Sequence, residues 1–453
     1  MAIERSSGIL LHVSSLPGDY GIGSFGKSAY KFIDFLSKSG QKYWQILPLN
    51  PVGEGNSPYS GSSAFAGNHL FIDLEILEEE GLLSAADYRE LDYGKDPMHV
   101  DYDEVKKNKM LALARAYENS KTSRLEGFDR FRSENSYWIQ EYAEFMAFSD
   151  YFNRPLQQWE IGVRTRDQEA IEEYSGLVGM EQADFYIFLQ YIFDRQWLNL
   201  KRYANERGIM IFGDIPVYVS LDSADVWSHP EVFDIDEELN AACVSGCPPD
   251  EFAPEGQRWG NPLYKWEYLE STGFDWWIRR IRRNMQLYDV LRIDHFRGLE
   301  SFYSIPCKCK NAIEGEWIKG PGSALFDAVK SELGNPDIVL EDLGFITKDV
   351  QQLREHTGYP GMKVFQFGFS DTMEDPSLPH NCCENTVIYL GTHDNDTCLG
   401  WIRNAGENAR NFAMWYVDEY DEREFVWKCL DKVMGSACIL SVFQMQDFLG
   451  LGS

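Results

Sequence analysis

The sequence predicts an α/β fold, a (β/α)8 TIM barrel with large helical and loop insertions. Eight short apolar, β-prone runs are spread over the 453 residues, and amphipathic helical patterns separate most of them. Short continuous apolar runs are typical of parallel strands buried on both faces, and strands that alternate with helices indicate a parallel sheet. Eight such units indicate a closed barrel, in which the chemistry takes place at the carboxyl ends of the strands.

The predicted strands are unevenly spaced along the chain. They are Gly8–Val13, Tyr43–Leu49, Ile209–Val219, Val290–Ile293, Ile338–Leu340, Met362–Phe369, Val387–Leu390 and Cys438–Phe443. Residues 50–207 separate the second strand from the third, far more than the roughly 30 residues of a plain strand–helix–strand unit. This stretch contains amphipathic patterns such as Phe185–Asn205, so we expect a largely helical insertion.

A single catalytic domain is expected to span residues 1–453, because no linker, repeat or low-complexity run divides the chain. Residues 220–285, between the third and fourth strands, include a long stretch rich in Pro, Gly, Asp and Trp. This composition predicts a loop-rich insertion. Long loops in a compact domain are usually functional, so we expect this insertion to cover the active site.

The charge and the cysteines restrict the partners and the compartment. Acidic residues outnumber basic residues by 72 to 42, giving a net charge of −30, so we expect neither nucleic acid nor a membrane surface as a partner. The 9 cysteines do not have the spacing of paired zinc sites, which favours reduced thiols. No run reaches roughly 18 apolar residues, and the N-terminus is a poor signal peptide. These features predict a cytoplasmic protein.

Carboxylates accompany four of the predicted strands. Asp214 lies within the third, Asp294 follows the fourth, Glu341 follows the fifth and Asp394 follows the seventh. If the barrel brings them together, one carboxylate can attack an anomeric carbon while another protonates the departing oxygen of a glycosidic bond. Arg292 precedes Asp294 by two residues and therefore points to the same side, where it can keep Asp294 ionised. The alternative is that these acids cap the helices that follow the strands.

Metal ligation is a competing hypothesis for the same strand ends. His295 stands beside Asp294 and His393 beside Asp394, and His and Asp side chains at strand ends hold metals in barrel metallohydrolases. Such enzymes often also present a His-x-His pair on the first strand. Here that strand offers only His12, and a lone histidine there is typical of a satisfied core group.

A glycine-rich segment suggests a different chemistry. Gly21–Ser28 (GIGSFGKS) matches the phosphate-binding pattern G-x-x-x-x-G-K-[ST] and precedes a helical pattern. In a phosphotransferase, Lys27 would contact the β and γ phosphates. A strand should then lead directly into the first glycine, but here SSLPGDY intervenes with its Pro-Gly turn signal. The alternative is a glycine-rich turn before the next helix.

Two polar loops carry aromatic residues on which a sugar ring can stack. Tyr59 lies in Asn56–Gly61 and Trp259 lies in Asp250–Pro262. An aromatic ring can cover the apolar face of glucose while amide, hydroxyl and carboxylate groups bond its hydroxyls. The loops therefore predict a sugar site, with structural packing as the alternative.

Together these motifs resemble the amylomaltases, the 4-α-glucanotransferase family of the α-amylase clan. The resembling segments are SSLPGDYGIGSFG, WQILPLNP, SPYSGSSAFAGN, GDIPVYV, PPDEFAPEGQRWGNPLYKW, LRIDHFRG, VLEDLG, KVFQFGF and GTHDNDT. The resemblance makes GIGSFGKS part of the family's first-loop motif. Family members usually continue beyond the eighth strand with a segment that supplies an Asn to the acceptor side, whereas this sequence ends at Ser453.

The resemblance implies an activity and a set of site residues. The activity is disproportionation of α-1,4-glucans by a retaining double displacement, with a glucose or maltooligosaccharide acceptor and with no cofactor or catalytic metal. Asp294 is implied as nucleophile, Glu341 as acid/base and Asp394 as transition-state stabiliser. The residues implied to bind substrate are Ser57, Tyr59, Asp214, Asp250, Gln257, Trp259, Arg292, His295, His393 and Phe367. A glucan hydrolase and a protein that only binds maltodextrin remain alternatives.

Overall fold

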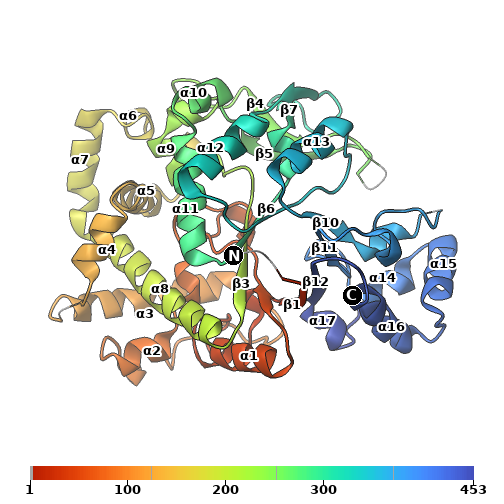
Figure 1. Ribbon diagram of the computed structural model, residues 1–453. Helices are drawn as coiled ribbons and strands as arrows, with labels where there is room; N and C mark the ends of the chain where they lie inside the picture. The colour runs from red at the N-terminus through yellow and green to blue at the C-terminus, as the bar shows by residue number, and fades with distance from the viewer. Residues whose placement is uncertain (1–3, 124, 251–252, 371) are drawn as a thin grey trace.

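Parallel strands close into a barrel at the centre of the molecule (Figure 1). The computed structural model describes residues 4–123, 125–250, 253–370 and 372–453. The barrel strands, in the order in which they are hydrogen-bonded around the barrel, are β1 (Ser6–Leu10), β12 (Leu440–Gln444), β11 (Thr386–Tyr389), β10 (Gly361–Val364), β9 (Ile338–Leu340), β6 (Val290–Ile293), β3 (Met210–Ile215) and β2 (Tyr43–Gln45). The first and last strands pair in parallel and so close the sheet. The predicted (β/α)8 barrel is confirmed.

Alternate residues of each strand point into the barrel and fill it. Phe212, Val290, Val339, Val387 and Val442 are among the buried residues of this interior cluster. The residues between them face outward and pack against the surrounding helices in a larger core cluster. Because both faces of each strand are buried, the strands appear in the sequence as continuous apolar runs.

Each predicted run overlaps a barrel strand, but several runs extend too far toward the C-terminus. The run predicted at Ile209–Val219 forms a strand only over Met210–Ile215, and the run at Met362–Phe369 gives way to a 3-10 helix at Phe365–Gly368. Most of the residues beyond these strand ends are apolar and buried, although they lie in loops of the site. The apolar pattern of the strand therefore continues into the loop, and the sequence does not show where the strand ends.

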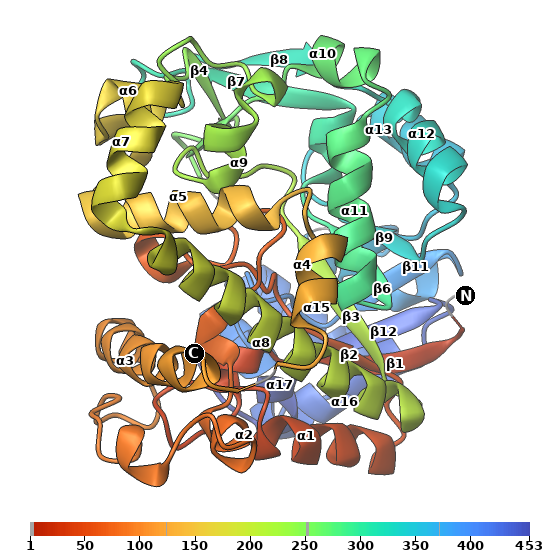
Figure 2. The ribbon, with the colours of Figure 1, turned by 90° about the vertical axis from the view of Figure 1, so that its left-hand side faces the viewer.

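The chain between β2 and β3 folds mainly into helices that gather on one side of the barrel (Figure 2). These helices are α2 (Leu74–Glu79), α3 (Tyr102–Ser120), α4 (Phe128–Glu134), α5 (Ile139–Phe152), α6 (Ile161–Arg164), α7 (Gln168–Val178) and α8 (Met180–Glu206). The longest of them, α8, contains the predicted pattern Phe185–Asn205 and packs against α5 and α1 (Lys27–Lys38).

A second sheet lies beside the barrel, at the top of Figure 1. It is antiparallel, and its strands in order are β5 (Gln257–Pro262), β4 (Cys243–Cys247), β7 (Ser301–Pro306) and β8 (Glu316–Lys319). The first two strands lie in the stretch for which the sequence predicts long loops. The sequences CVSGC and QRWGNP contain Gly, Pro and polar residues that are poor in strands, so the pairing between distant segments determines this structure.

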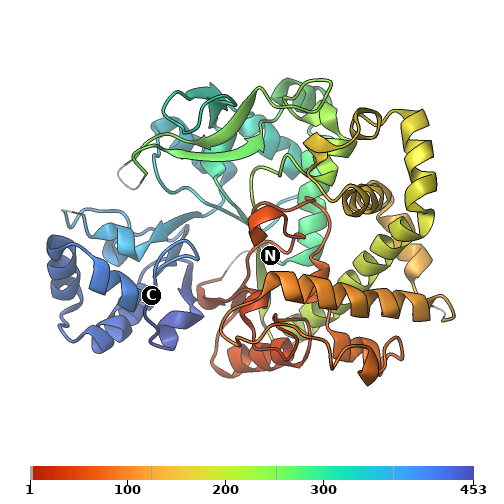
Figure 3. The ribbon, with the colours of Figure 1, turned by 180° about the vertical axis from the view of Figure 1, so that it is seen from behind.

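The remaining helices surround the barrel or extend from it. They are α9 (Ala224–Ser228), α10 (Trp266–Ser271), α11 (Asp275–Leu287), α12 (Ser323–Leu333), α13 (Lys348–Thr357), α14 (Cys398–Asn404), α15 (Glu407–Val417), α16 (Glu422–Met434) and α17 (Met445–Phe448). Helices α14 to α17 lie on the opposite side of the barrel from the helical insertion (Figure 3). None of the helices in the described part of the chain is both long and apolar enough to span a bilayer.

Candidate active site

The alternation of side chains along the strands carries polar residues to one end of the barrel. Asp214, Arg292 and Glu341 each follow an inward-facing core residue of β3, β6 or β9 by two positions. These three strands are neighbours in the barrel. Their inward-facing rows therefore meet at the carboxyl ends of the strands, where barrel enzymes place their chemistry.

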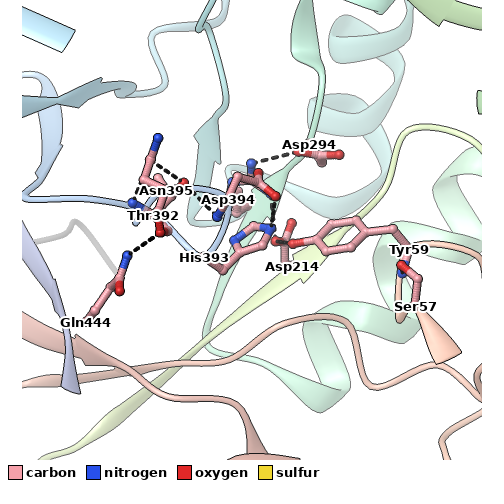
Figure 4. A network of polar contacts seen from close by, with 10 residues as sticks. Ser57, Tyr59, Asp214, Asp294, Thr392, His393, Asp394, Asn395 and Gln444 are labelled. Atoms are coloured by element: carbon pink, nitrogen blue, oxygen red, sulfur yellow. Dashed lines mark hydrogen bonds and ion pairs between the residues drawn. The ribbon is translucent and has the colours of Figure 1, made fainter. Parts of the chain in front are cut away.

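A chain of hydrogen bonds joins four of the predicted residues (Figure 4). Oδ2 of Asp214 accepts from the hydroxyl of Tyr59 and from Nη1 of Arg292, both at 2.6 Å, and Nη2 of Arg292 donates to Oδ1 of Asp294 at 2.7 Å. Asp214 and Arg292 are 1% and 3% exposed. Burial outweighs the attraction of Arg292 and raises the pKa of Asp214 to about 7. The guanidinium of Arg292 thus bridges the side chains of Asp214 and Asp294.

Glu341 is held by the backbone beside Asp294. Its Oε2 accepts from the backbone N–H of His295 at 2.7 Å, and its Oε1 accepts from that of Leu343 at 2.9 Å. His295 has a φ of 49°, a left-handed conformation that is uncommon for a residue with a side chain and clusters at functional turns. Burial, together with the charge of Asp294, raises the pKa of Glu341 to about 8. At pH 7 the protonated form of Glu341 is therefore favoured.

His393 and Asp394 approach from the loop after β11. Nε2 of His393 lies 3.3 Å from Oδ1 of Asp394, and the His393 ring stacks on Tyr59 with centroids 5.2 Å apart. Burial lowers the pKa of His393. The side chain of Asp394 is 74% exposed. The structure thus brings Asp394 beside the hydrogen-bonded chain but leaves its carboxylate open (Figure 4).

Trp259 reaches the site from β5 of the second sheet. Its ring stands edge-on to His295 with centroids 4.7 Å apart, and its indole N–H donates to Oε1 of Gln257 at 3.0 Å. Asp250 lies earlier in the same segment, where its Oδ1 accepts from the backbone N–H of Ala253 at 2.6 Å. The second sheet therefore presents an indole to the residue that follows Asp294.

Ser57 and Phe367 lie in two further loops. Oγ of Ser57 accepts from the backbone N–H of Tyr59 at 3.2 Å and so orders the turn that presents the tyrosine. Phe367, in the 3-10 helix after β10, lines a cavity of about 900 Å³ together with Asp394. A surface with room for several sugar rings therefore adjoins the exposed carboxylate.

The glycine-rich segment does not form a phosphate-binding loop. Strand β1 ends well before Gly21, and α1 begins at Lys27. A Cβ at Gly26 would lie 1.9 Å from Oδ2 of Asp73, so a carboxylate already occupies the helix N-terminus that a phosphate would need. Lys27 instead pairs with Glu75 at 2.8 Å. The phosphotransferase hypothesis is wrong.

His12 lies just after β1 and bonds the backbone of the chain after β2. Its Nδ1 accepts from the backbone N–H of Leu47 at 3.2 Å, and burial with the nearby charge of His393 lowers its pKa to about 3. Across the described residues, no three or more His, Cys, Asp or Glu side chains are grouped to hold a metal ion.

Two glutamines that the sequence analysis does not predict bond the loop that carries Asp394. Gln444, the last residue of β12, donates to the backbone carbonyls of Thr392 and, at 3.3 Å, Asn395. Gln366 donates to the carbonyl of Asp396 at 2.9 Å. The position of Gln444 on the inward face of a strand end is the one sequence signal that could have found it.

The fold and the site define a class of protein. A (β/α)8 barrel with an arginine-bound carboxylate beside a buried carboxylic acid is the arrangement of barrel enzymes that act on glycosidic bonds. A family model described as 4-alpha-glucanotransferase, glycoside hydrolase family 77, matches residues 11–453. The chain belongs to this family, and its activity is that of a 4-alpha-glucanotransferase on α-1,4-glucans.

Several relatives are similar to this chain over nearly its whole length. The 4-alpha-glucanotransferase of Streptococcus pneumoniae is 46% identical over 99% of this chain and 89% of its own, and that of Thermus thermophilus is 44% identical over 100% and 92%. The solved structure of amylomaltase from Streptococcus agalactiae in complex with acarbose has a TM-score of 0.96 at 40% identity, covering 99% of this chain and 91% of that chain.

Proposed function

We propose that the chain disproportionates maltooligosaccharides by a retaining double displacement in which Asp294 is the nucleophile and Glu341 the acid/base. One observation supports this assignment most. Asp294 lies 2.7 Å from the guanidinium of Arg292, whereas burial raises the pKa of the neighbouring Glu341 to about 8. A carboxyl group bonded to a guanidinium and a neighbouring carboxyl group whose pKa is raised by burial can divide the roles of nucleophile and acid.

In the first step, a carboxylate oxygen of Asp294 attacks the anomeric carbon of the donor glucan. The glycosidic C–O bond breaks, and the proton of Glu341 passes to the departing oxygen. A β-glucosyl ester of Asp294 remains, and Glu341 is left as a carboxylate. The hydrogen bond from Arg292 to Oδ1 leaves the other oxygen of Asp294 available for the attack.

In the second step, Glu341 takes the proton from the 4-hydroxyl of an acceptor, which is glucose or a maltooligosaccharide. The freed oxygen attacks the anomeric carbon, and the ester bond to Asp294 breaks. Two inversions restore the α-bond, Asp294 returns as a carboxylate, and Glu341 returns as an acid. The donor is shortened and the acceptor is lengthened by the same glucan unit.

The other site residues bind the sugar around this carbon. Asp394 is proposed to stabilise the positive charge that develops in the transition state, and the exposure of its carboxylate beside His393 supports this role. Among the described residues, Oδ1 of Asp214 and Nε2 of His295 are buried without a hydrogen-bond partner. Such atoms suit sugar hydroxyls, since a bound hydroxyl would supply the hydrogen bond that each of them lacks. Tyr59 and His393 offer a stacked pair beside them.

Transfer rather than hydrolysis requires that an acceptor sugar reach the intermediate before water does. The loops of Ser57, Tyr59, Gln257 and Trp259 are placed to fill the acceptor side and exclude water, with Asp250 and Phe367 at its borders. The solved structure of the similar Streptococcus agalactiae enzyme is a complex with acarbose, which supports a saccharide as the ligand of this chain.

We also propose a domain organisation for the whole chain and a cytoplasmic location. Residues 1–453 act as one catalytic unit, with 50–207 as a helical insertion and 220–285 as the segment that covers the site. The edge-on contact of Trp259 with His295 supports this covering role. The nine cysteines are free, which supports a reducing cytoplasm.

Incubation with maltotriose tests the proposed function. We expect glucose together with a ladder of maltotetraose and longer maltodextrins, resolved by thin-layer chromatography. Glucose and maltose without any longer product would make the chain a hydrolase. An Asp294→Asn sample prepared in parallel controls for contaminating amylases, because it should produce neither pattern.

A further inference from the structure

Asp394 is held differently from the other two proposed catalytic carboxylates. Arg292 bonds the side chain of Asp294, and two backbone N–H groups bond that of Glu341. The Asp394 carboxylate is largely exposed, and within the described residues its one ion pair is the 3.3 Å contact with His393. Its position therefore depends on the backbone of its loop.

The loop, residues 392–396, first organises itself. Oδ1 of Asn395 accepts from both the backbone N–H and the hydroxyl of Thr392 at 2.9 Å. The hydroxyl of Thr392 in turn accepts from the backbone N–H of Asp394 at 3.3 Å. These bonds shape a compact turn, but they do not attach that turn to the barrel.

Two buried amides make that attachment, and we define them as the glutamine clamp. Nε2 of Gln444 donates to the carbonyl of Thr392 and to that of Asn395, and Nε2 of Gln366 donates to the carbonyl of Asp396. Gln444 and Gln366 are 5% and 8% exposed. Gln444 ends β12 and Gln366 lies in the 3-10 helix that follows β10, and these are the two strands that flank β11. The loop is therefore tied to both neighbouring strands.

The glycine before the loop makes room for the clamp. A Cβ at Gly391 would lie 2.7 Å from Nε2 of Gln366 and 3.2 Å from Nε2 of Gln444. Any other residue at this position would displace at least the nearer of the two amides. Gly391 thus leaves room for both side chains to reach the carbonyls of the loop.

We infer that Gln444, together with Gln366, is a positioning residue that fixes Asp394 for the transition state. The inference rests on the proposed role of Asp394. An error of about 1 Å in the position of a catalytic group can reduce a rate about 100-fold. Both glutamines act through the backbone of the loop and not by contact with the sugar; Figure 4 shows Gln444 beside Thr392.

Gln444→Met tests the inference, since methionine keeps the length of the side chain but donates no hydrogen bond. Gln196→Met is the matched control. Gln196 is 3% exposed and bonds the backbone N–H and carbonyl of Asp73 at 2.7 and 3.1 Å, far from the loop. We expect kcat on maltotriose to fall about 10- to 100-fold in Gln444→Met with KM within about threefold, and kcat of Gln196→Met to stay within about twofold.

A double-mutant cycle separates positioning from general weakening of the fold. If Gln444 acts through Asp394, adding Gln444→Met to Asp394→Asn should lower the residual kcat by less than about threefold. An equal loss in both backgrounds, or a wild-type kcat in Gln444→Met, overturns the inference while the proposed function stands, provided that Asp394→Asn is inactive. A nearly wild-type kcat in Asp394→Asn overturns both. Gln366→Met, taken through the same cycle, replaces Gln444→Met if that variant does not fold.

Discussion

The two sides of the active site hold their acids by different means. On the side of β3, β6 and β9, Asp214 and Arg292 are buried and bonded to one another, and Arg292 also holds Asp294. On the side of β11, the Asp394 side chain is 74% exposed and a loop backbone sets its position. On the first side, residues of the proposed site therefore also stabilise the fold. On the second side, the proposed catalytic acid contributes little to the stability of the fold.

The largest expected effect comes from the nucleophile. Asp294→Asn should lower kcat about 10⁴-fold or more, because an amide cannot form the glucosyl ester. Oδ1 of the asparagine can still accept from Arg292, so the Tm should stay within a few degrees of the wild type. Initial rates on maltotriose and a thermal melt measure both quantities. Turnover near the wild-type rate would remove Asp294 from the mechanism.

A pair of alanine variants tests the comparison directly. Asp214→Ala removes one partner of a buried ion pair and should reduce the free energy of unfolding by about 3–5 kcal/mol. Asp394→Ala removes an exposed side chain and should change it by less than about 0.5 kcal/mol, although kcat collapses. Urea unfolding gives both values. Equal destabilisation by the two variants would break the proposed difference between the sides.

The raised pKa of Glu341 predicts two pH dependences. Glucosylation needs the proton of Glu341, so its rate should fall as pH rises through about 8, which single-turnover kinetics can follow.

The stability of the folded state should also depend on the pH through Glu341. The pKa of Glu341 in the folded state lies above the unfolded value of about 4.3, so its contribution to stability is fully present below that value and is lost as pH rises to about 8. Glu341→Gln cannot ionise. Its Tm advantage over the wild type should therefore grow between about pH 5 and 8 and then level off, and a constant difference would contradict the assignment.

Trp259→Ala should have the smallest effect. The indole is 38% exposed and contacts His295 edge-on, so its loss should leave the Tm nearly unchanged. Loss of a stacking surface worth about 1.4 kcal/mol would raise KM for the acceptor about tenfold. The ratio of hydrolysis to transfer should increase as water gains access. Arg258→Ala, which alters the exposed neighbour on the same strand, is the control.

The sequence predicts the barrel well because each strand is short, apolar and buried on both faces. Val290–Ile293 and Ile338–Leu340 are predicted to the residue. The second sheet could not be predicted, because β5 (QRWGNP) has no local strand signal and pairs with β4, whose other edge pairs with the distant strand β7. Among the site residues, alternation explains why Asp214 and Glu341 point inward. The residue type does not predict the glutamine clamp, because the sequence does not show whether a glutamine bonds water or a buried carbonyl. Only the inward position of Gln444 at a strand end is a signal.

The pairing of Ser6–Leu10 with Leu440–Gln444 has a consequence for the order of folding. Almost the whole described chain separates these two strands, so their contact closes a very long loop and carries a large entropic cost. Until they pair, the sheet is open and Gln444 cannot tie down the Asp394 loop. We therefore expect the loop of Asp394 to become ordered only in one of the last steps of folding.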